Sequence, residues 1–194
     1  MIVTDIEATG LDAEKCSILS IGAVNFDNPT EQFYEECRAF DGATFFEEGM
    51  VVNGFSVDEA TDPKKQSEAE LVARFAAWVA KQNTIKIIAG QFVVVDIAYL
   101  QAACARAGME YFFPRYFIDL HSVSYAEHLK KGASIPMNNT KPSLRLDETL
   151  KYLGLPEEPK PHIAINGAKL EAEAFSRIIY GKQLLEEYKK YPLI

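Results

Sequence analysis

Short apolar runs separated by turn-forming residues occupy the first forty positions of the chain. Residues 2–6 and 18–24 are the clearest runs, and 32–39 is a third candidate with two aromatic side chains. Apolar runs of this length bounded by turns are typical of strands. The links between them are short, which predicts an antiparallel meander.

Further along, apolar positions recur at helical spacing. Ser67 and Glu70 have the form of a capping box, and Leu71, Phe75 and Val79 follow at helical intervals. Other apolar patterns predict strands at 85–89 and 116–120, a loop at 132–143, and helices at 96–107, after 120 to about 130, 146–153, 167–180 and 182–190. A meander followed by alternating helices and strands predicts an α/β fold, a mixed sheet with helices on its faces.

Length and charge limit the organisation of the chain. The 194 residues suit one domain, with a core over 1–180 and a C-terminal helix over 181–194. The net charge of −8 argues against tracking a long duplex, because phosphates are normally neutralised by lysine and arginine. It is compatible with holding a few nucleotides through metal ions.

Cysteine usage and hydropathy predict the compartment. The three cysteines are scattered without metal-ligand spacing, so we expect free thiols in a reducing environment. A basic leader does not precede the first strand, and the apolar stretches are shorter than a membrane span. We therefore expect a soluble, cytoplasmic protein that does not contact membranes.

Two carboxylates stand at the end of the first predicted strand. Asp5 and Glu7 are two residues apart, so both side chains point to one face of a strand. Adjacent carboxylates repel each other, and a hard divalent cation such as magnesium or manganese relieves the repulsion. The alternative interpretation is an acidic strand end followed by a turn at Thr9 and Gly10.

Two further residues are candidates for chemistry, and each has a structural alternative. Asp96 opens a predicted helix, where an aspartate is often only an N-cap. His162 precedes another helix and has the side chain most suited to proton transfer near neutral pH. A single loop histidine is nevertheless more often structural or merely exposed.

Taken together, these segments resemble the three motifs of the DEDD exonucleases, in the subclass marked by a histidine. Asp-x-Glu-x-Thr-Gly-Leu occupies 5–11, an aspartate followed by Ala-Tyr-Leu occupies 96–100, and His-x-Ala begins at 162. The resemblance spans 1 to about 180. It implies an RNase H-like fold with a five-stranded mixed sheet, in which an antiparallel meander is followed by parallel strands.

The resemblance also implies roles for individual residues. Asp5, Glu7 and Asp96 would hold two magnesium or manganese ions that bracket the scissile phosphate, and His162 would take the proton from the attacking water. The implied substrate contacts are Thr9, the backbone of Ile6 and Ala8, a wedge at Leu11, and the second-motif positions Gln91 and Phe92.

The chain departs from the family pattern at two positions that bear on catalysis. The fourth carboxylate is expected five residues after the histidine, where this chain has Gly167, and Phe92 takes the place of an asparagine. Glu171 lies one helical turn beyond Gly167 and leans back over it, so we expect its longer side chain to supply the missing carboxylate. The alternative is that Glu171 is a solvated helix residue.

The favoured interpretation is a metal-dependent 3′–5′ exonuclease that acts on single-stranded DNA, RNA or short oligonucleotides and releases nucleoside 5′-monophosphates. A second interpretation is a catalytically impaired pseudo-exonuclease that binds nucleic-acid 3′ ends, which Gly167 favours. A third is a subunit that contacts a polymerase or nuclease partner. The sequence leaves open whether the chain forms a homodimer or joins a polymerase-type partner.

Overall fold

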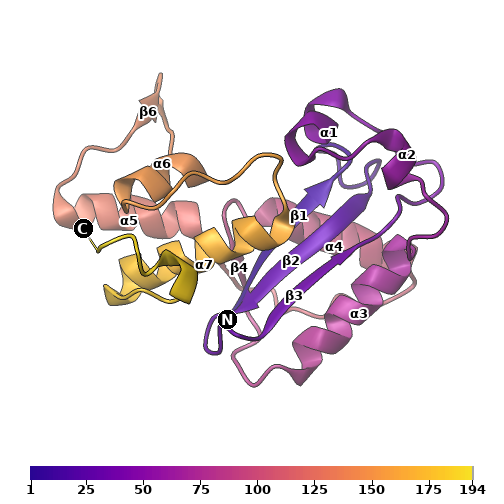
Figure 1. Cartoon of the computed structure of the whole chain (residues 1–194), viewed down its shortest axis with the longest axis horizontal. Coiled ribbons are helices and arrows are strands. Elements are labelled where there is room, and N and C mark those ends of the chain that lie inside the picture. The colour runs from indigo at the N-terminus through magenta and orange to yellow at the C-terminus, as the bar shows by residue number, and fades with distance from the viewer. Residues whose placement is uncertain (194) are drawn as a thin grey trace.

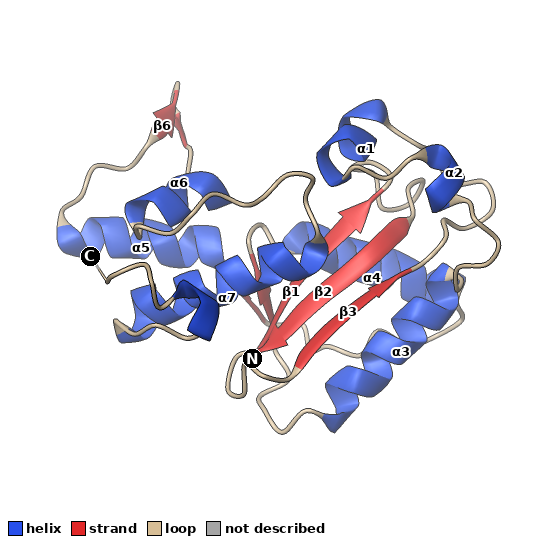
Figure 2. Ribbon diagram, viewed as in Figure 1, coloured by secondary structure: helices blue, strands red, loops and turns tan. Residues whose placement is uncertain are grey.

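One mixed sheet organises the chain in the computed structural model, which describes residues 1–193. The strands are β1 (Ile2–Ala8), β2 (Ile18–Asn25), β3 (Gln32–Glu36), β4 (Ile88–Gly90) and β5 (Phe117–Asp119). Their order is β3-β2-β1-β4-β5. The first three pair antiparallel, whereas β4 pairs parallel with both β1 and β5. This confirms the predicted mixed five-stranded sheet (Figure 2).

Helices cover both faces of this sheet (Figure 1). The elements outside it are α1 (Glu47–Asn53), α2 (Val57–Ala60), α3 (Glu68–Lys81), α4 (Val94–Arg106), α5 (Leu120–Lys131), α6 (Leu146–Tyr152), α7 (Ala164–Tyr180), the 3-10 turn η1 (Glu186–Tyr188) and the hairpin of β6 (Met137–Asn138) and β7 (Lys141–Pro142). Within residues 1–193, no helix combines the length and the apolar character that a bilayer crossing requires.

Alternation along the strands divides the core into two layers. Ile2 belongs to a cluster with residues of α3 and α4, whereas its neighbour Val3 belongs to a cluster with residues of α5, α6 and α7. All of β2 is buried, as expected for a strand covered on both sides. Polar residues of β2 such as Ser20 and Asn25 are therefore buried with it.

Helix α7 touches the sheet directly at Gly22 of β2. A Cβ at that position would lie 2.1 Å from the carbonyl carbon of Ala164 and 2.2 Å from the amide nitrogen of Ile165. Only a residue without a side chain permits this approach. Gly22 pairs with Asp5 across the two strands, so the start of α7 lies directly beside the first motif.

The C-terminal helix predicted over 182–190 is wrong, because within 181–193 only η1 has helical geometry. Position 194 of the predicted segment lies outside the described residues. Side chains of α7 instead bind backbone groups of this segment in its non-helical path. Glu173 accepts hydrogen bonds from the amides of Leu184 and Leu185. Arg177 donates to the carbonyl oxygens of Leu153, Tyr188, Tyr191 and Pro192.

Other boundaries also differ from expectation. The third strand ends at Glu36 instead of 39, and the fourth spans Ile88–Gly90 instead of 85–89. Asp96 is the third residue of α4 and not its N-cap, which is Val93. The loop expected over 132–143 contains the hairpin of β6 and β7. Helices α1 and α2 were not predicted, because their short segments lack a sustained apolar period.

Substituting Gly22 with alanine should destabilise the protein, because the added methyl group collides with the backbone of α7. We expect the free energy of unfolding to fall by about 1–3 kcal/mol, as in other overpacked cores. Urea denaturation measures this change.

Ser20→Ala is the matched control, because Ser20 lies two residues away on the same face of β2 and the substitution adds no atom. Equal stability of Gly22→Ala and the parent protein would show that α7 can retreat from the sheet without cost.

Candidate metal centre

The two carboxylates of β1 lie under the start of α7. Glu7 is buried, and Asp5 is so close to Gly167 that a Cβ built there would lie 2.2 Å from Oδ2 of Asp5. Strand alternation places both side chains on the same face, as predicted. The carboxylates therefore occupy the interface between the sheet and α7.

Asp96 and Glu171 bring two more carboxylates to the same place from different helices. Asp96 is buried in the first turn of α4, and Glu171 is only 3% exposed on α7. Burial and then the charge of Asp5 raise the pKa of both carboxyls well above the usual range. The alternative interpretation of Glu171 as a solvated residue is therefore wrong. The charge of Asp5 acts on Glu7, Asp96 and Glu171, so the four carboxylates predicted as metal ligands lie near one another.

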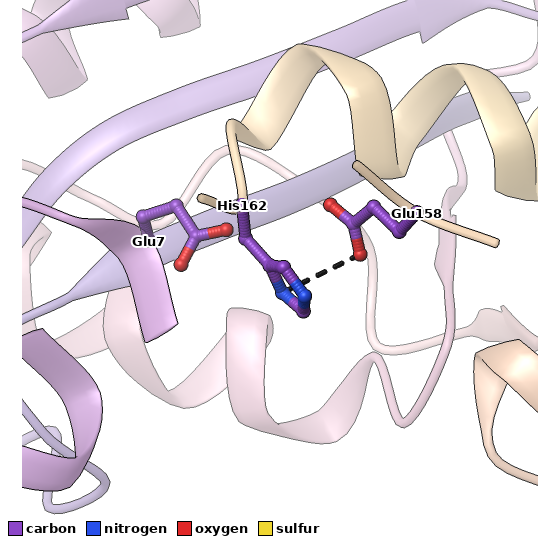
Figure 3. A group of neighbouring side chains, drawn as sticks. All are labelled: Glu7, Glu158 and His162. Atoms are coloured by element: carbon purple, nitrogen blue, oxygen red, sulfur yellow. Dashed lines mark ion pairs between the residues drawn. The ribbon is translucent and has the colours of Figure 1, made fainter. Parts of the chain in front are cut away.

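A fifth carboxylate comes from the loop before α7. Potential ligand atoms of Glu7, Glu158 and His162 all lie within 4.8 Å of one another. The imidazole of His162 lies between the two carboxylates, with Nδ1 3.4 Å from Oε2 of Glu158 (Figure 3). Sequence reasoning missed Glu158. Its only signal is a position four residues before His162 in a loop that contains prolines.

Burial dominates the electrostatics of this cluster, and like charges add to its effect. Burial raises the pKa of Asp5 to about 7. Burial followed by neighbouring carboxylates raises the pKa of Glu7 to about 9 and that of Glu158 to about 8. Burial is the larger cause in each case, because it penalises the charged form of the group.

The donor set fits a divalent cation. Oε1 of Glu158 and Oε2 of Glu171 are buried and have no hydrogen-bond partner among the described residues. A buried carboxylate oxygen without a partner is costly unless a cation approaches it. Several carboxylates and one imidazole are ligands that manganese and related divalent ions accept, and the carboxylates suit magnesium.

His162 is held by its backbone, and its surroundings favour the neutral imidazole. Its amide donates to the carbonyl oxygen of Val52 in α1, at 3.0 Å. Burial lowers the pKa of the imidazole below its usual value. A partly exposed, neutral imidazole at the edge of a carboxylate cluster can accept a proton from water.

A cavity of about 610 Å³ opens beside Glu7. The first-motif residues Ile6, Ala8 and Leu11 line it, and the Leu11 side chain is 89% exposed there. The remaining lining includes Phe46, residues of α1 and residues of α4, namely Glu48, Gly49, Val52, Asn53, Val95 and Tyr99. Of the carboxylates in the cluster, Glu7 is the one that lines this cavity.

Thr9 does not line the cavity. Its side chain is fully buried, and its hydroxyl donates to the carbonyl oxygen of Thr44 and accepts from the amide of Ser17. The hydroxyl is therefore engaged in holding the turn after β1.

Helix α1 connects the first motif to the loop that carries His162. The Asn53 side chain donates to the carbonyl oxygen of Ala8 at 3.0 Å, and the carbonyl oxygen of Val52 accepts from the amide of His162. Both residues of α1 also line the cavity. Helix α1 thus forms part of the cavity wall and also supports the backbone of His162.

The two second-motif positions lie outside the cavity lining. The Gln91 side chain donates to the carbonyl oxygen of Leu144 at 2.8 Å. Phe92 has a left-handed backbone, with φ 51°, and its exposed ring stacks on His121 with the ring centroids 5.0 Å apart. These contacts leave the predicted roles of Gln91 and Phe92 in substrate binding as predictions.

Comparison with protein families gives a match over most of the chain. The model of the exonuclease family RNase_T matches residues 2–175. This region contains the whole sheet and every carboxylate of the cluster. None of the curated proteins matches the sequence.

Solved structures of E. coli exonuclease I share the fold. The complex with a 5cy-dT13 oligonucleotide is 20% identical, with a TM-score of 0.73 over 94% of this chain and 40% of that chain. The complex with dA16 is 18% identical, with a TM-score of 0.71 over 94% and 41%. The zinc-bound complex with ssDNA is 16% identical, with a TM-score of 0.71 over 93% and 41%. The chain thus spans about two fifths of these proteins, and the likeness confirms the RNase H-like fold.

The raised pKa values predict that the metal-free protein loses stability as pH rises. Unfolded aspartate and glutamate release their protons near pH 4, whereas Asp5, Glu7 and Glu158 hold theirs up to about pH 7, 9 and 8 in the folded state. The folded protein binds more protons in this window, so the free energy of unfolding should fall between about pH 4 and pH 9.

Thermal unfolding in a chelator at a series of pH values measures this slope. Asp5→Asn should reduce the slope and raise the midpoint at pH 8, by ~2–4 °C for each kcal/mol of relieved repulsion. Manganese should raise the midpoint of the parent protein at the same pH. A midpoint that stays level or climbs with pH in the chelator would show that the carboxylates are ionised without penalty.

Proposed function

From the premise that this chain belongs to the RNase_T exonuclease family, we propose that it is a 3′–5′ exonuclease that releases nucleoside 5′-monophosphates. The proposed substrates are single-stranded DNA or RNA, or short oligonucleotides. The observation that supports the proposal most is the cavity of about 610 Å³ lined by Glu7, one member of the cluster of carboxylates. Structures of E. coli exonuclease I with ssDNA and with product support it by analogy of fold.

The carboxylates are proposed to hold divalent ions. Asp5, Glu7 and Asp96 would bind two magnesium or manganese ions, with Glu171 as a further ligand from α7. When bound, such ions polarise the scissile phosphate and stabilise the departing 3′ oxygen. The buried oxygen of Glu171 without a hydrogen-bond partner supports its inclusion.

His162 is proposed as the general base. Its lowered pKa favours the neutral form, which alone can take a proton from the attacking water. Glu158 lies 3.4 Å from Nδ1 and would orient the ring while the other nitrogen faces the reacting water. The backbone contact to Val52 restricts the position of the residue further.

The terminal nucleotide is proposed to bind in the cavity. The backbone of Ile6 and Ala8 would contact it, and the exposed side chain of Leu11 would wedge against its base. Thr9 would act through the turn that its hydroxyl holds. Gln91 and Phe92 would contact the strand farther from the cavity, Phe92 through its exposed ring.

A second candidate function is a pseudo-exonuclease that binds 3′ ends without cutting them. Gly167 is the observation that favours it, because the resemblance places an acidic ligand at that position. The buried carboxylates and the positioned imidazole favour the enzyme, since a binding module requires no general base and gains nothing from crowding acids.

Purified protein should shorten a single-stranded oligonucleotide from its 3′ end in magnesium or manganese, and a chelator should stop it. Asp5→Ala should abolish cleavage, because the residue contacts the centre of the cluster. Gel analysis of oligonucleotides labelled at the 5′ end measures the shortening. Asp58→Ala is the matched control, because Asp58 is exposed on α2. Cleavage by Asp5→Ala at the parent rate would place the activity elsewhere, and an inert parent that still binds 3′ ends would favour the pseudo-exonuclease.

Replacing His162 with alanine should lower the cleavage rate by ~10²–10⁴-fold, the usual contribution of a general base. Metal affinity should change much less, because the carboxylates remain. Single-turnover cleavage and calorimetric titration with manganese separate the two effects. Loss of metal with an unchanged rate per bound metal would instead make the imidazole a ligand.

A further inference from the structure

The volume beside Gly167 is already occupied by carboxylates. A Cβ built on Gly167 would lie 2.2 Å from Oδ2 of Asp5 and 3.3 Å from Oε1 of Glu158. The space in which a side chain at 167 would begin is therefore bordered by two acidic groups, one from β1 and one from the loop before α7. The space that a side chain at position 167 would enter is therefore not empty.

Glu158 has the properties of a ligand at this place. Its side chain is 7% exposed, although the neighbouring Glu157 is exposed in the same loop. Oε2 contacts His162, whereas Oε1, the atom that faces Gly167, is buried without a hydrogen-bond partner. A carboxylate held in this way lacks a positive partner on the side that faces Asp5.

We infer that Glu158 supplies, from the loop before α7, the metal-binding carboxylate that the chain lacks at Gly167. The inference rests on the proposed function, because it assigns a ligand of the same metal centre. It is carried by the approach of Oε1 to Gly167 and by the absence of any hydrogen-bond partner for that atom among the described residues.

Glu171 reaches the cluster from another direction. A Cβ built on Gly90 would lie 3.3 Å from Oε2 of Glu171, so this carboxylate lies against the end of β4. Oε1 of Glu158, in contrast, lies against the start of α7. Glu171 thus adds an acidic group next to β4, while Glu158 takes the position next to Gly167 and His162.

The arrangement also explains why position 167 has no side chain. An aspartate there would meet the Asp5 carboxylate at once and the Glu158 carboxylate next. Three acidic groups would then share one buried volume, with a correspondingly larger repulsion. The carboxylate of Glu158 therefore depends on the absence of a side chain at Gly167. Replacing Gly167 alone is expected to weaken metal binding.

Manganese binding by the full chain tests the inference without relying on activity. Free manganese measured by electron paramagnetic resonance, together with calorimetry, gives the number and affinity of bound ions. Glu158→Gln should lose one bound ion or bind it at least ~10-fold more weakly, a loss at least as large as that from altering the surroundings of a ligand. Glu157→Gln is the matched control, and it should bind manganese as the parent does.

A pair of variants tests the position. Gly167→Asp alone should weaken manganese binding, because it crowds Asp5 and Glu158. Combining Gly167→Asp with Glu158→Ala should weaken manganese binding by less than the two single losses multiplied together, because Glu158→Ala removes one of the two carboxylates that the new side chain meets. Losses that simply multiply would overturn the assignment of Glu158 to the place beside Gly167.

The outcomes separate this inference from the proposed function. Unchanged manganese binding by Glu158→Gln, while Asp5→Asn abolishes it, would overturn the role of Glu158 and leave the metal-dependent exonuclease intact. A parent protein that binds no manganese would overturn both. Circular dichroism checks folding, and if Glu158→Gln does not fold, Glu158→Asp replaces it. The aspartate keeps the charge but withdraws it by one methylene, so it should also weaken binding, and unweakened binding overturns the inference.

Discussion

The direct contact between the backbone of α7 and the sheet is the constraint on which the arrangement of the acidic cluster depends. Gly22 lets the first turn of α7 lie on β2, and Gly167 in that helix leaves room for the carboxylate of Asp5. With no side chain between them, helix and sheet enclose the acidic groups of β1. The burial of these groups, the raised pKa values and the need for a positive partner all follow from this approach.

The crowded carboxylates lower the stability of the folded state, whereas the apolar core raises it. The two core layers supply the favourable burial, with fully buried residues such as Phe75 on one face and Phe175 on the other. The acidic cluster lies between β1 and α7 and is unfavourable when ionised without cations. A bound divalent ion would turn the same groups into a stabilising set.

Local patterns allowed much of the sheet and most of the cluster to be predicted from the sequence. Strand alternation placed Asp5 and Glu7 together. The helical repeat brought Glu171 to the cluster, but its Oε2 lies against Gly90 and not against Gly167. Glu158 could not be predicted, because it lies in a loop without a period and looks identical to the exposed Glu157. The C-terminal helix was predicted wrongly, because local spacing carries no information about the distant side chain of Arg177, which binds the carbonyl groups of that segment.

Helix α1 contacts both the end of β1 that borders the cavity and the loop that carries His162. Through Asn53 it supports the strand end that borders the cavity, and through Val52 it supports the backbone of His162. A shift of this single element would alter the fit of the nucleotide and the aim of the imidazole at the same time. Under the proposed function, substrate affinity and turnover would therefore be coupled through α1, and substitutions along this helix would change KM and kcat together.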